Sequence, residues 1–175
     1  HTQSDVTWYP QRPITEITIV DNDAISTAIN AERMRLGPTA VHNFACRSSP
    51  GGGYQHGVEA QEEDLCRSIP ALESDLYEKQ YPIGEAEVFV TRHGEIRRRM
   101  HQETIESEPL ATVTILTSAM PNIRKYGWTD TEQAYKERLT QEIEALIWTA
   151  TKEGIRTLIT GAPGCGSFGN SPRDV

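Results

Sequence analysis

The chain has 175 residues, of which 37% are hydrophobic and 24% are charged, and its formal net charge is −8. The hydrophobic fraction excludes a disordered chain, and size scaling gives a folded surface of ~8,600 Å² against ~28,000 Å² unfolded, enough burial for one ordinary domain. The acidic balance disfavours nucleic-acid binding through a general cationic surface. Because no apolar run approaches the length of about 18 residues that a membrane span requires, we expect no membrane partner.

Three cysteines, Cys46, Cys66 and Cys165, form an odd set without the spacing of a metal site. Such a set favours neither a disulfide framework nor a zinc site. We therefore expect an intracellular, reducing compartment, which is the cytoplasm, or the nucleus if the source is eukaryotic.

The first elements alternate between strand and helix. Residues 16–20 alternate apolar and polar side chains, which predicts a strand. Asp23 can cap a helix that ends at Gly37 and that has an apolar face made of Ala24, Ile25, Ala28 and Ile29. The following segments predict a strand at 40–45, a glycine-rich loop at 46–57 and a helix at 58–67.

The second half of the chain continues this alternation. A strand at 87–91 followed by His93 and Gly94 predicts a hairpin with residues 95–96, and residues 111–116 predict a buried strand. The longest helix is predicted over 131–152, with Gly154 as its stop and a buried face made of Leu139, Ile143, Leu146, Ile147 and Ala150. A strand at 156–160 then leads into a second glycine-rich loop, 161–170.

This order of elements predicts an α/β domain with a largely parallel central sheet that helices cover on both faces. We find no internal repeat and no linker, so residues 1–175 are interpreted as a single domain. Ser171 is a good N-cap and Pro172 suits a first helical position, so a helix is expected to begin there. We expect the domain to continue through that helix and a further strand.

Both glycine loops follow predicted strands, where open α/β sheets bind ligands. Successive backbone N–H groups in such loops can hold a diphosphate without Lys or Arg. Gly51, Gly52 and Gly53 are not followed by the Lys and Ser/Thr of a P-loop. The Gly-x-Gly-x-x-Gly pattern at 164–169 comes too late in the chain for a dinucleotide fold.

Gln61, Glu62 and Glu63 stand at a predicted helix start just after the triple glycine. Neighbouring carboxylates point about 100° apart on a helix, so one can face a pocket while the other braces a neighbouring group. Cleavage of a glycosidic bond needs a carboxylic acid that protonates the leaving oxygen and a carboxylate that activates water. The position of this pair favours such chemistry.

Several segments together resemble the bacterial-type (microbial) poly(ADP-ribose) glycohydrolases, a branch of the macrodomain family. The resemblance covers residues 15–175 and rests on Val41-His-Asn-Phe-Ala45, Pro50-Gly-Gly-Gly53, Gly57, Ala60-Gln-Glu-Glu63, Leu65-Cys-Arg67 and Gly161-Ala-x-Gly-Cys-Gly166 through Phe168, Asn170 and Pro172. It implies a macrodomain-like three-layer α/β/α sandwich with a mixed, largely parallel central sheet, and an ADP-ribose pocket.

The resemblance also implies roles for individual residues. Glu63 matches the catalytic glutamate and Glu62 its neighbour that positions the ribose. The implied ligand-binding residues are Asn43, Gly51, Gly52, Gly53 and Gln61 in the first region and Gly164, Cys165, Gly166, Ser167 and Phe168 in the second, with Phe168 packing on the distal ribose. Cys46 and Pro163 depart from the pattern, and we expect them to alter affinity rather than chemistry. No metal or cofactor is implied.

The implied reaction cleaves the ribose–ribose O-glycosidic bonds of poly(ADP-ribose) and releases ADP-ribose. Glu63 would protonate the leaving ribose oxygen and then activate water. Polymer or ADP-ribosylated protein is the expected substrate of a monomeric enzyme. The alternatives are a mono-ADP-ribosyl-protein hydrolase, a non-catalytic ADP-ribose-binding macrodomain and thiol catalysis by Cys165.

Overall fold

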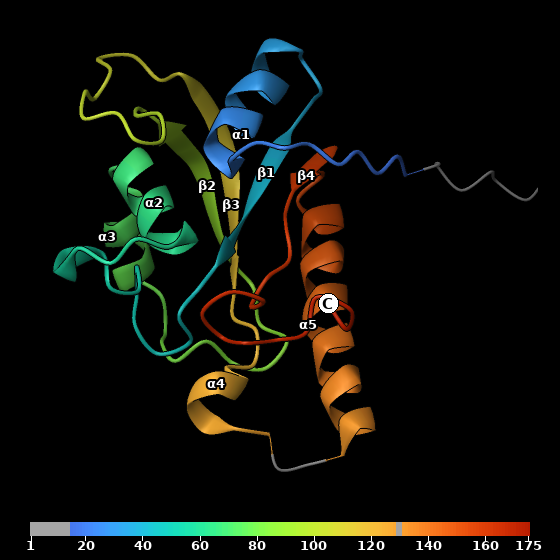
Figure 1. Cartoon of the computed structure of the whole chain (residues 1–175). Helices are drawn as coiled ribbons and strands as arrows, with labels where there is room; N and C mark the ends of the chain where they lie inside the picture. Colours follow the sequence, from blue (N-terminus) through green and yellow to red (C-terminus); the bar gives the residue numbers. More distant parts are fainter. Residues whose placement is uncertain (1–14, 129–130) are drawn as a thin grey trace, which may run out of the picture.

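The computed structural model describes residues 15–128 and 131–175, and its centre is a four-stranded mixed sheet. The strands are β1 (Thr39–Phe44), β2 (Phe89–Ile96), β3 (Ala111–Ser118) and β4 (Thr157–Ile159), in the spatial order β2-β3-β1-β4 (Figure 1). Strand β1 pairs in parallel with both β3 and β4, whereas β2 is antiparallel to β3. The predicted mixed and largely parallel sheet is confirmed.

Helices cover the two faces of this sheet. The helices α1 (Ala24–Arg33), α2 (Gln61–Ser68) and α3 (Leu72–Tyr77) pack on one face, and α5 (Glu132–Lys152) packs on the other (Figure 1). A short 3₁₀ turn (Tyr54–His56) precedes α2, and the short helix α4 (Ile123–Tyr126) follows β3. The predicted three-layer α/β/α arrangement is confirmed.

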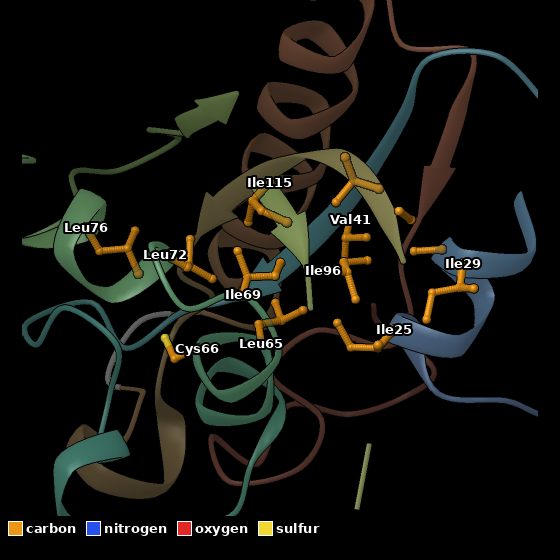
Figure 2. Packing of buried hydrophobic residues seen from close by; sticks show 13 residues of the cluster. Ile25, Ile29, Val41, Leu65, Cys66, Ile69, Leu72, Leu76, Ile96 and Ile115 are labelled. Carbon is orange, nitrogen blue, oxygen red and sulfur yellow. The ribbon is translucent and has the colours of Figure 1, made fainter. Parts of the chain in front are cut away.

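The larger part of the core lies between the sheet and helices α1 to α3. Figure 2 shows its buried side chains, among them Ile25, Ile29, Val41, Leu65, Ile69, Leu72, Leu76, Ile96 and Ile115. Each such side chain contributes about 1.5–3 kcal/mol when fully removed from water. The α5 face is smaller and consists of Ala40, Leu116, Leu146 and Ala150. Strand β1 therefore contributes to both cores, with Val41 on the larger one and Ala40 on the smaller one.

Two helices begin at their predicted positions, and α5 also ends as predicted, whereas α1 ends at Arg33, before the predicted stop at Gly37. The carboxylate of Asp23 caps α1 by accepting a hydrogen bond from the Ser26 backbone N–H at 2.7 Å, and the Thr131 hydroxyl caps α5 by accepting from the Ala134 N–H at 3.2 Å. The apolar face of α5 is narrower than predicted, because Ile147 is 54% exposed. It follows Leu146 by one residue and is therefore turned about 100° away from the sheet.

The predicted strand at 16–20 is wrong. Residues 15–20 have no regular secondary structure, and Ile17 and Ile19 are almost fully exposed. A strand exists only where a neighbouring strand shares its backbone hydrogen bonds. Among residues 15–128 and 131–175, this segment pairs with none, so the alternation of its side chains is not sufficient to make it a strand.

The predicted hairpin at His93 and Gly94 is also wrong. Residues 89–96 form the single strand β2, whose register against β3 shifts between Thr91 and Gly94. His93 adopts a positive φ of 60°, which makes this site a bulge within one strand. A side chain at position 94 would be crowded, since a Cβ atom would lie 3.3 Å from both the Ile115 side chain and the Val113 carbonyl oxygen.

The helix predicted over 58–67 begins three residues later, at Gln61. Gly57 ends the preceding 3₁₀ turn in a left-handed conformation, and Val58 remains in the loop, where its carbonyl accepts a hydrogen bond from the Arg67 guanidinium. Helix α3 was not predicted. At the other end of the chain, Ser171 starts a turn in which its carbonyl accepts from the Val175 N–H at 3.2 Å.

Two further predictions concern composition. Within the described part of the chain, none of the helices combines the length and the apolar character of a membrane span. Cys46, Cys66 and Cys165 are free thiols. Burial raises the pKa of the Cys66 thiol to about 12, and carboxylates near it raise the pKa further, so this cysteine packs in the core as a neutral side chain.

Candidate active site

The two glycine loops leave the sheet at the same edge. Strands β1 and β4 are parallel neighbours, with Val41 opposite Ile159, so the segments that follow them start side by side. The first segment runs from Ala45 through the triple glycine to α2, and the second is the loop 161–170 (Figure 1). This carboxyl edge is where open α/β sheets bind ligands.

Gln61, the first residue of α2, connects this helix to the end of β1 through two hydrogen bonds. Its side-chain oxygen accepts a hydrogen bond from the Phe44 N–H at 2.8 Å, and its side-chain nitrogen donates to the His42 carbonyl at 2.7 Å. The amide therefore acts like a short piece of a neighbouring strand. It fixes the direction in which the next two residues, Glu62 and Glu63, point.

Glu62 is 3% exposed, and both of its oxygens are engaged. Oε2 accepts a hydrogen bond from the Cys46 N–H at 2.7 Å, and Oε1 accepts one from the Asn43 amide at 3.4 Å. Burial raises the pKa of Glu62 to about 7 despite these hydrogen bonds, and the adjacent carboxylate of Glu63 raises it further. At neutral pH this side chain is therefore partly protonated.

Glu63 is 5% exposed and differs from Glu62 in how its oxygens are used. Oε1 accepts a hydrogen bond from the Gly53 N–H at 2.7 Å. Within residues 15–128 and 131–175, no hydrogen bond forms to Oε2. This oxygen is not completely enclosed by the protein. One oxygen of Glu63 is therefore anchored and the other is open to a ligand.

The triple glycine packs directly against this pair. Gly52 has a φ of +59°, and a Cβ atom on it would lie 2.4 Å from Glu63 Oε1 and 3.0 Å from Glu62 Oε2. A Cβ atom on Gly53 would lie 2.4 Å from the Val58 side chain, and Gly51 is buried. The glycines are required because the protein's own side chains fill the space beside the loop.

Asn43 lies beneath Glu62 at the end of β1 and is completely buried. Its amide nitrogen donates to the Thr117 hydroxyl at 3.3 Å and to Glu62 at 3.4 Å. Among the described residues its Oδ1 atom has no hydrogen-bond partner. Asn43 thus braces Glu62 from below, which is a more indirect position than the ribose contact that the resemblance implies.

The second loop is held by Asn170. The amide nitrogen of Asn170 donates to the carbonyls of Pro121 at 2.9 Å and Gly164 at 3.1 Å, and its oxygen accepts from the Tyr135 hydroxyl at 2.7 Å. A Cβ atom on Gly164 would lie 2.2 Å from this amide nitrogen. Sequence reasoning included Asn170 in the family pattern but gave it no role, although its position after Gly169 is typical of a residue that fixes a turn.

The exposed tip of this loop consists of Gly166 and Ser167, next to the half-buried Cys165 and Phe168. A Cβ atom on Gly166 would meet nothing within 4 Å. Partial burial raises the pKa of the Cys165 thiol, which disfavours the thiolate that a nucleophile needs. The structure therefore gives thiol catalysis by Cys165 no support.

A cavity of about 410 Å³ is lined by Cys46, the residue whose N–H binds Glu62. Cys46 and Phe168 line it on the side of the two glycine loops, and residues 120–122 and 125–128, which include part of α4, line it on the other side. Sequence reasoning missed this wall. The signal was present in Asn122, which caps α4, and in the cationic and aromatic side chains of Lys125, Tyr126 and Trp128.

In the ranges 15–128 and 131–175, no group of three or more His, Cys, Asp or Glu side chains is arranged to hold a metal ion. His42, in β1, is a buried side chain that bonds to the hydroxyls of Ser118 at 2.9 Å and Thr160 at 3.0 Å. Burial lowers its pKa to about 3, so it is a neutral core residue.

A family model described as "Microbial-type PARG, catalytic domain" matches residues 3–110, which is more than half of the chain. The chain belongs to this family. PARG stands for poly(ADP-ribose) glycohydrolase, and the match contains β1, the triple glycine and both glutamates. The family resemblance that the sequence motifs suggested is confirmed. A search of curated proteins found no match.

Solved structures of bacterial PARG proteins have the same fold. The chain is similar to the Thermomonospora curvata enzyme bound to the inhibitor ADP-HPD, with a TM-score of 0.75, 27% identity, and coverage of 89% of this chain and 61% of that chain. It is also similar to the Deinococcus radiodurans enzyme in complex with ADP-ribose, with a TM-score of 0.73, 26% identity, and coverage of 87% and 65%. This chain therefore spans about three fifths of the length of these relatives.

Proposed function

We propose that the chain is a poly(ADP-ribose) glycohydrolase that cleaves ribose–ribose O-glycosidic bonds and releases ADP-ribose, with Glu63 as general acid and base. The observation that carries this proposal is the unequal pair of glutamates, in which Glu63 has one anchored and one open oxygen. Membership of the PARG family and similarity to structures that contain ADP-ribose or an inhibitor support it.

Substrate binding would rely on backbone amides. A net charge of −8 disfavours binding of a polyanion through a general cationic surface. The N–H groups of the second loop, near the exposed Gly166, can donate to a diphosphate without a side chain in the way. We assign ADP-ribose binding to Gly51, Gly52, Gly53, Gly164, Cys165, Gly166, Ser167 and Phe168.

The chemistry follows from the open oxygen of Glu63. Protonated Oε2 donates its proton to the ribose oxygen that leaves, and the glycosidic bond breaks through an oxocarbenium-like state. The resulting carboxylate then removes a proton from water, which adds to the anomeric carbon. The Gly53 N–H holds Oε1 during both steps. Glu62 positions the ribose, and its raised pKa limits the negative charge beside Glu63.

The substitution Glu63→Gln tests this assignment because it keeps the size of the side chain and removes the transferable proton. We expect release of ADP-ribose from poly(ADP-ribose) to fall by on the order of 10²- to 10⁴-fold. The Kd for ADP-ribose, measured by calorimetry, should stay within a few-fold. Glu59→Gln, at an exposed position in the preceding loop, is the matched control. Unchanged turnover in Glu63→Gln would sink the assignment.

Two alternatives use the same pocket. A mono-ADP-ribosyl-protein hydrolase would release ADP-ribose from a singly modified protein faster than from polymer, so the two substrates should be compared directly. A non-catalytic binding module would bind ADP-ribose without releasing it from either substrate. The glutamate pair favours an enzyme, since a binding module has no need of two carboxylates buried side by side at a cost in stability.

The remaining proposals concern the oligomeric state, the substrate and the cellular compartment. We propose a monomer that takes polymer or ADP-ribosylated protein as its substrate. The three free thiols support an intracellular, reducing compartment.

A further inference from the structure

The cavity that Cys46 lines has two different walls. One wall is shared with the candidate active site through Cys46 and Phe168. Cys46 marks the boundary, because its N–H is bound to Glu62 Oε2 at 2.7 Å while its side chain lines the cavity. The cavity is therefore linked to Glu62 through Cys46, and it extends from there to Lys125 and Tyr126 of α4.

The α4 wall carries a positive charge that the protein leaves unpaired. Lys125 forms no salt bridge within the described part of the chain, and its ammonium lies 5.0 Å from the centre of the Tyr126 ring. The other cationic residues of the cavity are neutralised, since Arg47 and Arg138 both pair with the buried Glu142 and Arg138 also pairs with Glu85. Lys125 is thus the cation that a ligand in this cavity can use.

The same wall presents aromatic rings. Tyr126 is 68% exposed and Trp128 is 36% exposed, although large aromatic side chains usually bury most of their surface. Trp128 is held in place, because its ring packs edge-on against Tyr135 with centroids 5.3 Å apart and its indole N–H donates to the Thr131 carbonyl at 3.3 Å. An exposed but anchored ring beside a free cation is the combination that binds a nucleobase and its phosphates.

We infer that this cavity binds the leaving group of the reaction. The leaving group is the neighbouring ADP-ribose unit of the polymer, which regains a free ribose hydroxyl when the bond breaks. This inference rests on the proposed function. The glycine loops hold the unit that becomes free ADP-ribose, so the next unit must extend past the glutamates on another side. The cavity volume of about 410 Å³ is within the range of sites for small ligands. The adenine base of the leaving unit stacks on Tyr126 and Trp128, and Lys125 neutralises the diphosphate of this unit.

The double variant Lys125→Ala/Tyr126→Ala tests this subsite. Both side chains are on the surface, so we expect an unchanged Tm. The matched control is Trp148→Ala/Lys152→Ala on the outer side of α5, where the Lys152 ammonium lies 5.3 Å from the ring centre of the exposed Trp148. The control removes the same kinds of group from a place that is not part of the cavity.

Three measurements separate the outcomes. In the Lys125→Ala/Tyr126→Ala protein, kcat/KM for poly(ADP-ribose) should fall on the order of tenfold, mainly through KM. The Kd for ADP-ribose and the hydrolysis of ADP-ribose that carries only a nitrophenyl group at its anomeric oxygen should not change. The control variant should match the wild type in all three measurements.

The results that would overturn the inference are distinct from those that concern the reaction itself. Wild-type protein that hydrolyses neither substrate overturns the proposed function and this inference together. Wild-type protein that hydrolyses both, with an unaffected double variant, overturns the inference alone. A weaker Kd for ADP-ribose in the double variant would show that the cavity holds the product unit instead, and it also overturns the inference.

Discussion

The two glycine loops at the carboxyl edge of the sheet use glycine for opposite reasons. At Gly52 the space that a Cβ atom would take is filled by oxygens of Glu62 and Glu63. At Gly166 the corresponding space is open. Glycine in the first loop therefore makes room for the protein's own carboxylates, whereas glycine at the tip of the second loop leaves room for a ligand.

The supports of the two loops differ as well. In the first loop the amides of Cys46 and Gly53 donate to glutamate side chains, one of which has a pKa near 7. In the second loop the neutral amide of Asn170 makes the connections. The geometry of the first loop is therefore sensitive to protonation in a way that the second is not.

The largest expected effect comes from adding a methyl group to each loop, which tests whether the two loops use glycine for different reasons. Gly52→Ala forces a side chain into the position of Glu63 Oε1 and into a left-handed backbone conformation. Since a misplacement of about 1 Å can cost 10²-fold in rate, we expect turnover of poly(ADP-ribose) to fall by at least on the order of 10²-fold, with a lower Tm.

Gly166→Ala is the matched substitution. Its methyl group meets no protein atom within 4 Å, and its backbone is not left-handed. We expect an unchanged Tm in thermal unfolding and a higher Kd for ADP-ribose in calorimetry. Equal losses of Tm in the two variants would show that the loops are packed alike, contrary to the structure.

The second prediction concerns the protonation of Glu62. The pKa of Glu62 is about 7 in the folded protein, whereas its ordinary value of 4.5 applies to the unfolded chain. As the pH rises, the unfolded chain therefore loses this proton before the folded protein does. The stability that protonated Glu62 provides is fully present below pH 4.5 and is lost as the pH rises through 7. The difference of 2.5 units corresponds to about 3 kcal/mol.

The variant Glu62→Gln removes this titration and keeps the shape of the side chain. Asn43 can turn its amide so that the unpartnered Oδ1 accepts a hydrogen bond from the new amide. Relative to wild type, the free energy of unfolding of Glu62→Gln should therefore rise by about 3 kcal/mol between pH 4.5 and pH 7.5 in urea denaturation. Glu59→Gln, which is exposed, should show no such change. A difference that is independent of pH would refute the titration.

The regular elements were predictable where one pattern dominated. Helix α5 has a capping Thr131, an apolar stripe and a terminal Gly154, and each of these signals is local. The segment 16–20 has an equally clear alternation but finds no sheet partner among the described residues. The bulge at His93 depends on the contact between Gly94 and β3, a neighbour that a local pattern does not reveal.

The candidate site shows the same division. Its residue types were readable, because two glycine loops after strands and a neighbouring pair of carboxylates are sequence features. The division of roles between Glu62 and Glu63 was implied only by the family resemblance, because its physical basis is which backbone amide reaches which carboxylate oxygen. Asn170 and the α4 wall were missed because their partners, Pro121, Tyr135 and Phe168, are distant in sequence.

The smallest of the three expected effects tests the second loop. Asn170→Ala removes three hydrogen bonds from a residue that is 2% exposed and leaves the Tyr135 hydroxyl and two carbonyls without this partner. We expect the free energy of unfolding to fall by about 2 kcal/mol, because buried polar groups lose their partners. The Kd for ADP-ribose should also weaken.

Tyr135→Phe separates these two effects. It removes one of the three hydrogen bonds and leaves both links from Asn170 to the loop and to Pro121 in place. We expect a smaller loss of stability, about 1 kcal/mol, and an unchanged Kd. Because Asn170 is neutral, its contribution should be the same at pH 4.5 and pH 7.5, unlike that of Glu62. A pH-dependent effect of Asn170→Ala would mean that the second loop is coupled to the glutamate pair, and the two loops would then act as one unit.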